Sequence, residues 1–182
     1  MTFDNQKWET LNKESILVKK PWFEVFQEEI RLPDGKVVPE YYEIEMPHYS
    51  AVFSVTVEQK IIVLSCYSHA IGEVTLTMPG GMIEKGESPL AGIQREFLEE
   101  TGYVAKKWKS LGAFKGNSTR GCGTYHLFFA TGAYSVQEPD SGDLEELELL
   151  LWKQQQVEEA LDEGQAKSLG VASMLLLGLR CL

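Results

Sequence analysis

Residues Gly81 to Tyr103, GMIEKGESPLAGIQREFLEETGY, contain the signals for both ends of a helix. Ser88 can accept a hydrogen bond as the N-cap, and Pro89 suits the first helical position. Helical spacing then continues to Thr101, and Gly102 is well placed to end the helix. The sequence therefore predicts a polar loop followed by a capped helix.

Three carboxylates crowd one stripe of this predicted helix. Glu96 and Glu100 are four residues apart and share a face, and Glu99 lies beside them. Like charges at this spacing repel each other, and a hard divalent cation would reverse that cost. The alternative is an ordinary solvated acidic helix face.

A different face of the same helix carries apolar side chains. Leu90, Ile93 and Phe97 follow i, i+3, i+7 spacing. We expect all three to pack into the core, which would anchor the helix and hold the glutamate stripe in place.

The whole stretch resembles the Nudix box, Gx5Ex7REUxEExGU, in which U is a bulky apolar residue. Every fixed position matches, and the two U positions next to Glu96 and Gly102 hold the aromatic residues Phe97 and Tyr103. A match at so many positions is far more specific than a lone glycine motif. The matching residues are Gly81, Glu87, Arg95, Glu96, Phe97, Glu99, Glu100, Gly102 and Tyr103.

The resemblance implies an α+β fold, the Nudix α/β/α sandwich with a mixed central sheet, and an enzyme that cleaves a phosphoanhydride bond. Carried over by position, Glu96, Glu99 and Glu100 become ligands of Mg²⁺, with Mn²⁺ as the alternative ion. The same resemblance implies a further ligand in the Gly80 carbonyl and a supporting role for Glu87. Arg95 would orient the glutamates, or form only a surface salt bridge.

The catalytic base is less well defined by the resemblance. In many relatives it comes from the box, where Glu99 and Glu100 are candidates, or from a carboxylate in a later loop. Here the segment DSGDLEELE offers Asp143, Glu145 and Glu146 before a predicted strand that ends at Trp152. Glu145 is the first choice in that loop and Glu146 the second, and the alternative is a charged loop without a catalytic role.

The residues before the box predict an N-terminal β extension over residues 1–46, with the Nudix domain over 47–182. Extended segments from Ile16 to Met46 flank the turn PDGK, in which Asp34-Gly35 is a hairpin signal. This layout resembles the ADP-ribose and ADP-sugar pyrophosphatase branch. The resemblance implies that the N-terminal strands help to build a homodimer, in which the partner completes the substrate pocket.

Several residues outside the box are candidates for substrate contact. Trp22, Phe23, Tyr41 and Tyr42 could stack on adenine or pack in an interface, and core packing is the simpler alternative. Further along, the glycine-rich segment KGNSTRGCG is predicted as a ligand loop between strands at about 107–114 and 124–131. Its Arg120 could bind a phosphate, and the nearby His126 could face the site, although both could be structural.

Composition narrows the possible partners and the compartment. The net charge of -10, without a basic stretch, argues against binding to nucleic acid. No segment is apolar for the 20 or so residues that a membrane span needs, and the 14 residues from Leu169 to Leu182 predict a docked helix instead. Three widely spaced cysteines and a polar N-terminus fit a reduced, cytoplasmic setting.

The sequence and the resemblance together predict a Mg²⁺-dependent hydrolase of a small nucleotide. Its reaction would cleave the diphosphate bond of ADP-ribose or another ADP-sugar to AMP and a sugar phosphate. Two alternatives stay open: a Nudix hydrolase of another nucleotide, such as a nucleoside triphosphate or a dinucleoside polyphosphate, and a Nudix module that senses a nucleotide without cleaving it.

Overall fold

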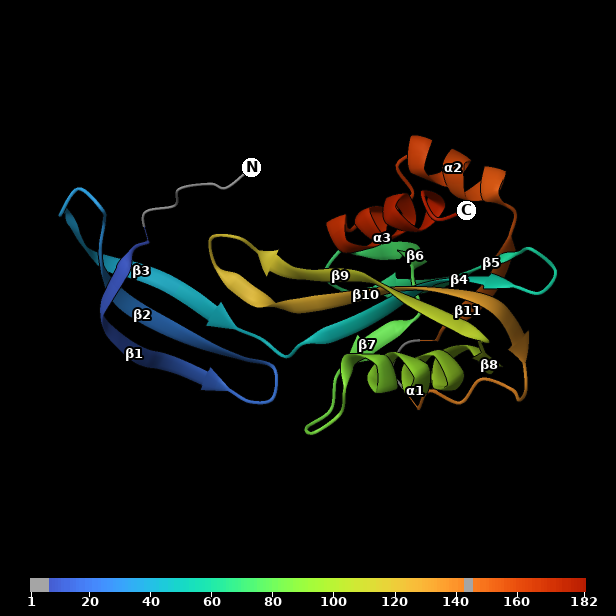
Figure 1. The fold of residues 1–182 in the computed structure, drawn as a ribbon, viewed down its shortest axis with the longest axis horizontal. Coiled ribbons are helices and arrows are strands. Elements are labelled where there is room, and N and C mark those ends of the chain that lie inside the picture. Colours follow the sequence, from blue (N-terminus) through green and yellow to red (C-terminus); the bar gives the residue numbers. More distant parts are fainter. Residues whose placement is uncertain (1–6, 143–145) are drawn as a thin grey trace. The chain divides into compact units, whose positions relative to one another are not determined.

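The computed structural model describes residues 7–142 and 146–182, and the chain divides into two compact units. The first unit contains the chain up to Pro47 together with Lys115–Thr124. The second contains His48–Phe114 and Tyr125–Leu182. Figure 1 shows the elements of both units.

The first unit is built on a three-stranded antiparallel sheet. Its strands are β1 (Glu9–Lys19), β2 (Phe23–Arg31) and β3 (Val37–Glu45), paired in that order. The β2–β3 hairpin was predicted from Asp34-Gly35, and Gly35 has the positive φ, 87°, that such a turn favours. The predicted extended segments are confirmed, although β1 begins well before Ile16.

The hairpin of β9 (Lys107–Asn117) and β10 (Gly121–Ser135) replaces most of the predicted ligand loop. Only residues 118–120 separate the two strands, so the prediction of a loop over KGNSTRGCG was wrong. The loop was predicted because glycines normally interrupt strands. In β10 the glycines instead adopt positive φ angles within the strand. Gly123 has a φ of 75°, and a Cβ there would lie 2.5 Å from the Pro47 carbonyl oxygen.

The second unit is organised by a mixed sheet in which β10, β4, β5 and β11 are neighbours in that order. The pairing of β10 with β4 is parallel, and those of β4 with β5 and of β5 with β11 are antiparallel. Short strands pair with this frame: β6 with β5, β7 with β4, and β8 with β10. The bounds are β4 (Tyr49–Thr56), β5 (Ile61–Ser68), β6 (Glu73–Thr77), β7 (Gly80–Met82), β8 (Tyr103–Val104) and β11 (Glu148–Trp152).

Helices cover both faces of this sheet, which gives the predicted α/β/α layers (Figure 1). Successive residues of a strand point to opposite faces, and the core divides accordingly. Val52 packs with α1 (Pro89–Thr101), whereas its neighbour Phe53 packs with α2 (Gln154–Asp162) and α3 (Leu169–Leu179). None of the described helices is long and apolar enough to cross a membrane.

Helix α1 has the predicted bounds and caps. Ser88 Oγ accepts a hydrogen bond from Ala91 N at 3.2 Å, and Gly102 ends the helix with a left-handed φ of 73°. Ile93 and Phe97 are fully buried, as predicted. The prediction that Leu90 is also buried was wrong, because its side chain lies in the first turn outside both core clusters and is 39% exposed.

Candidate active site

The site begins where α1 crosses the short strand β7. Gly80 N donates a hydrogen bond of 2.7 Å to Glu100 Oε2, and the Glu100 side chain is buried. A Cβ at Gly81 would lie 2.4 Å from the carboxyl group of Glu96, so any other residue here would displace that carboxylate. The backbone of β7 therefore lies directly against two of the three predicted metal-binding glutamates.

Arg95 holds the carboxylates of the loop and the helix together. Its Nε and Nη2 donate to the two oxygens of Glu87, each at 3.1 Å, as a bidentate pair. Its Nη1 donates to Glu96 Oε1 at 2.9 Å and to Glu99 Oε2 at 3.0 Å. Nη2 also donates to the Met82 carbonyl at 3.2 Å, a contact for which the sequence held no signal.

Arg95 and Glu87 each stabilise the charged form of the other. The hydrogen bonds from Arg95 hold the pKa of Glu87 below its ordinary value, and a hydrogen bond from Glu84 N contributes to the same shift. Hydrogen bonding to Glu87 likewise raises the pKa of Arg95 above its ordinary value. Both side chains are therefore ionised at neutral pH, and Glu87 ties the loop to the helix.

The donor set fits a hard divalent cation by its chemistry. Glu96, Glu99 and Glu100 offer only carboxylate oxygens, and β7 adds the carbonyl of Gly80, which are the ligand types that Mg²⁺ and Mn²⁺ prefer. Within residues 7–142 and 146–182, no three acidic, histidine or cysteine side chains converge on one point as ligands of an ion do. Arg95 Nη1 forms ion pairs with one oxygen of Glu96 and one oxygen of Glu99, at 2.9 and 3.0 Å.

His126 lies in β10, one strand away from the site. It is the register partner of Ser50 on β4, and Ser50 in turn pairs with Gly81 on β7. The ring centroids of His126 and His48 are 6.2 Å apart. Burial, together with the charge of His48, lowers the pKa of His126, which favours a neutral imidazole at pH 7.

The chain after β10 is fastened to the last turn of α1. Asp140 N donates a hydrogen bond of 2.8 Å to the Glu99 carbonyl. The segment that leads into the predicted base loop therefore lies next to the helix that carries the three glutamates. Glu146 is exposed and lies just before β11. The first-choice base, Glu145, and the neighbouring Asp143 lie outside the described residues.

The remaining substrate candidates belong to the first unit. Arg120 donates a hydrogen bond of 3.0 Å to the Tyr42 carbonyl, and its guanidinium lies 5.4 Å from the centroid of the Tyr41 ring. Trp22, in the turn between β1 and β2, is 63% exposed and belongs to neither core cluster of the described residues. Phe23, the first residue of β2, is half-buried.

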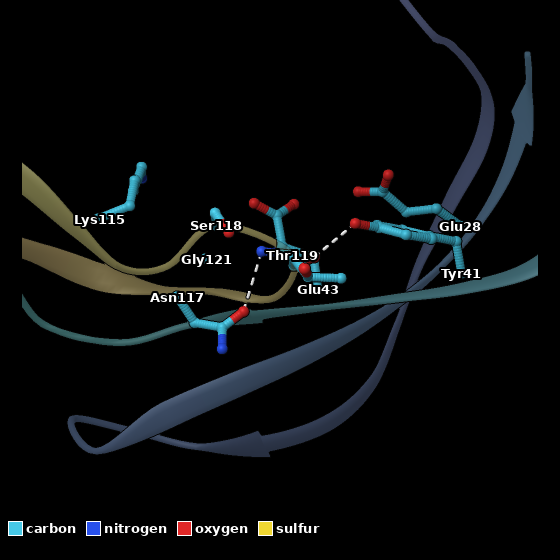
Figure 2. Close-up of a pocket in the computed structure, with 8 residues that line it drawn as sticks. All are labelled: Glu28, Tyr41, Glu43, Lys115, Asn117, Ser118, Thr119 and Gly121. Atoms are coloured by element: carbon cyan, nitrogen blue, oxygen red, sulfur yellow. Dashed lines mark hydrogen bonds between the residues drawn. The ribbon is translucent and has the colours of Figure 1, made fainter. Parts of the chain in front are cut away.

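A pocket of about 260 Å³ opens beside Tyr41, whose hydroxyl donates to the Thr119 carbonyl (Figure 2). Asn117 shapes one side of it by accepting the backbone N–H groups of Thr119 and Arg120 at 2.9 and 2.7 Å. The hydrogen bond from Lys13 holds the pKa of the lining residue Glu43 below its ordinary value. The lining residues are Glu28, Tyr41, Glu43, Lys115, Asn117, Ser118, Thr119 and Gly121.

Comparison with known proteins settles the family. The family model described as "NUDIX domain" matches residues 46–169. The chain belongs to the Nudix family. The match includes the whole of β7, the loop after it and α1, so the resemblance predicted from Gly81–Tyr103 is confirmed.

Both curated proteins and solved structures resemble this Nudix protein. ADP-ribose pyrophosphatase of Bacillus subtilis (strain 168) is 32% identical over 137 residues, which cover 75% of this chain and 73% of that protein. Methanol dehydrogenase activator of Bacillus methanolicus is 30% identical over 128 residues, 67% of this chain and 69% of that protein. A crystal structure of ADP compounds hydrolase superposes with a TM-score of 0.80 at 21% identity, covering 97% of this chain and 94% of the other, and this likeness shows the fold.

The family and the first of these relatives identify the chain as a Nudix hydrolase. The enzyme class predicted from the sequence is thereby confirmed, as is the mixed α/β/α fold. Nudix hydrolases act on small nucleotide derivatives and generally use a divalent metal, which agrees with the carboxylate chemistry of α1.

Proposed function

We propose that this Nudix hydrolase cleaves the diphosphate bond of ADP-ribose, or of another ADP-sugar, to AMP and a sugar phosphate in a Mg²⁺-dependent reaction. The observation that carries the proposal is the ordered glutamate set of α1, held by the hydrogen bonds of Arg95 and Gly80. The similarity to the ADP-ribose pyrophosphatase of Bacillus subtilis supports the choice of substrate.

The residues of the set divide into ligands of the metal ion and an arginine that orients them. Glu96, Glu99, Glu100 and the Gly80 carbonyl would hold Mg²⁺, with Mn²⁺ as a substitute. A bound divalent ion supplies charge neutralisation of the diphosphate and a water of lowered pKa. Arg95 fixes the glutamate side chains before the ion binds, which reduces the reorganisation that binding requires.

The proton of the attacking water needs an acceptor near the glutamates. We assign this role to Glu145, with Glu146 as the alternative in the same loop and Glu99 or Glu100 as the alternatives in the box. The hydrogen bond from Asp140 N to the Glu99 carbonyl supports the choice of this loop, because it fastens the preceding segment to the glutamate helix.

The N-terminal strands are proposed to form a homodimer, with residues 1–46 as the dimerisation element and 47–182 as the Nudix domain. Trp22, Tyr42 and Arg120 are retained as candidate substrate contacts in that dimer. The high exposure of Trp22 supports an interface or ligand role over core packing.

The decisive experiment compares Glu100→Gln with Glu58→Gln, a control in the exposed β4–β5 turn. AMP release from ADP-ribose is measured with Mg²⁺, with Mn²⁺ and after chelation by EDTA. We expect Glu100→Gln and EDTA each to lower turnover by about a hundredfold or more, while Glu58→Gln retains wild-type turnover. Circular dichroism should show that both variants remain folded.

Undiminished turnover in Glu100→Gln would contradict the assignment of the metal site. A panel that adds nucleoside triphosphates and dinucleoside polyphosphates tests the choice of substrate. Binding without turnover across that panel would show a nucleotide sensor in place of an enzyme.

A further inference from the structure

Strand β4 carries two buried serine hydroxyls on the face that packs against α1. Ser50 is 1% exposed and Ser54 is fully buried, and the Oγ of each lacks a hydrogen-bond partner among the described residues. Both lie on the same face as Val52, which belongs to the core cluster of α1. A buried hydroxyl without a partner is unfavourable, so each of the two requires an explanation.

Ser50 differs from Ser54 because it borders the active site. A Cβ built on Gly92 of α1 would lie 3.5 Å from Ser50 Oγ and 2.9 Å from Glu87 Oε2. The hydroxyl and the carboxylate therefore both lie next to the position that a side chain at residue 92 would fill. Because residue 92 is a glycine, no side chain separates them there. Ser50 also pairs with Gly81, whose Cα approaches Glu96.

Ser54 lies between apolar residues of the two neighbouring strands. Its register partners are Ile62 on β5 and Ala130 on β10, both apolar and fully buried. It lies four residues from Ser50, roughly 13 Å along an extended strand. Both register partners belong to the core cluster of α1, so Ser54 borders apolar core rather than the carboxylates of the site.

We propose that Ser50 is a positioning residue for catalysis, and that its hydroxyl supports the Glu87 carboxylate through one buried water. The Ser50 hydroxyl would donate to the water, and the water would donate to Glu87 Oε2. Buried waters typically bind to polar groups that lack other partners, as Ser50 Oγ does among the described residues. Glu87 Oε2 already accepts hydrogen bonds from Arg95 Nη2 and Glu84 N, and the water would be its third donor. The inference rests on the proposed function, in which Glu87 holds Arg95 and Arg95 holds the glutamates.

The kinetic test uses Ser50→Ala and the matched control Ser54→Ala. We expect Ser50→Ala to lower kcat for ADP-ribose about tenfold, as loss of an outer hydrogen bond at a metal site does, with KM within about twofold of wild type. Ser54→Ala should retain both constants. Neither variant should lower the midpoint of urea denaturation, because each removes a hydroxyl without a protein partner.

Wild-type kcat in Ser50→Ala, or an equal loss in Ser54→Ala, would overturn the inference. A crystal structure of the wild-type enzyme provides a readout that does not depend on activity. The expected result is an ordered water within about 3.2 Å of both Ser50 Oγ and Glu87 Oε2, and an empty or apolar contact there would overturn the inference. Failure of the wild type to cleave ADP-ribose would contradict only the proposed function, and the crystal structure would still decide the role of Ser50.

Discussion

Arg95 shows why residue type matters as much as charge in this site. A guanidinium has five N–H donors in a fixed planar fork, and the five hydrogen bonds of Arg95 to Glu87, Glu96, Glu99 and the Met82 carbonyl match that number. A lysine at this position would keep the charge but offer only three donors without the planar geometry. The role of Arg95 is therefore to fix directions, in addition to balancing negative charge.

Substitution of Arg95 by lysine should accordingly lower activity while leaving the fold intact. We expect kcat/KM for ADP-ribose to fall by about 10- to 100-fold, because Glu96 and Glu99 would lose their shared donor. Steady-state kinetics measure this loss, and Arg180→Lys at the exposed end of α3 is the control. Wild-type kcat/KM in Arg95→Lys would show that charge alone is sufficient.

Helix α1 could be predicted from sequence because its signals are local. The cap at Ser88, the proline at position 89 and the stop at Gly102 all lie within the helix or next to it, and the structure confirms each. The contact from Gly80 N to Glu100 joins residues 20 positions apart and depends on how β7 packs, so no local pattern could predict it. The exposure of Leu90 has a similar origin, because helical spacing predicts which residues share a face but not how far the core extends along that face.

The apolar anchor of α1 can be tested with a pair of substitutions. Phe97→Ala should lower the free energy of unfolding by about 3–5 kcal/mol, because Phe97 is fully buried and packs edge-on against Trp108. The centroids of the two rings are 5.7 Å apart. Leu90→Ala, at a 39% exposed position, should cost under about 1 kcal/mol. Urea denaturation gives both values, and equal costs would mean that the first turn of α1 contributes as much to the core as Phe97 does.

The two units of the molecule differ in how much apolar surface they bury. Ile30 is the one buried apolar side chain among the described residues of the first unit, whereas the second unit has two core clusters. A small sheet without a core is marginal in water by itself. Its exposed apolar side chains are Trp8, Ile16, Leu17, Val18, Trp22 and Val37.

Strand β1 suggests how a second copy of the chain could stabilise the first unit. It is an edge strand of 11 residues, and Ile16, Leu17 and Val18 on it are 44–52% exposed. Soluble proteins normally protect such edges, and pairing with another chain is one way to do so. We therefore expect Val18→Asp to convert a wild-type dimer to a monomer, since a carboxylate in an apolar interface is costly to desolvate.

Sedimentation velocity over a range of protein concentrations measures the oligomeric state. Leu176→Asp is the matched control, because Leu176 is a similarly exposed apolar residue, 56% exposed, but lies on α3 of the second unit. The control should sediment as the wild type does. A monomeric wild type, or a dimer that Val18→Asp leaves intact, would mean that the exposed apolar residues of β1 do not hold two copies together.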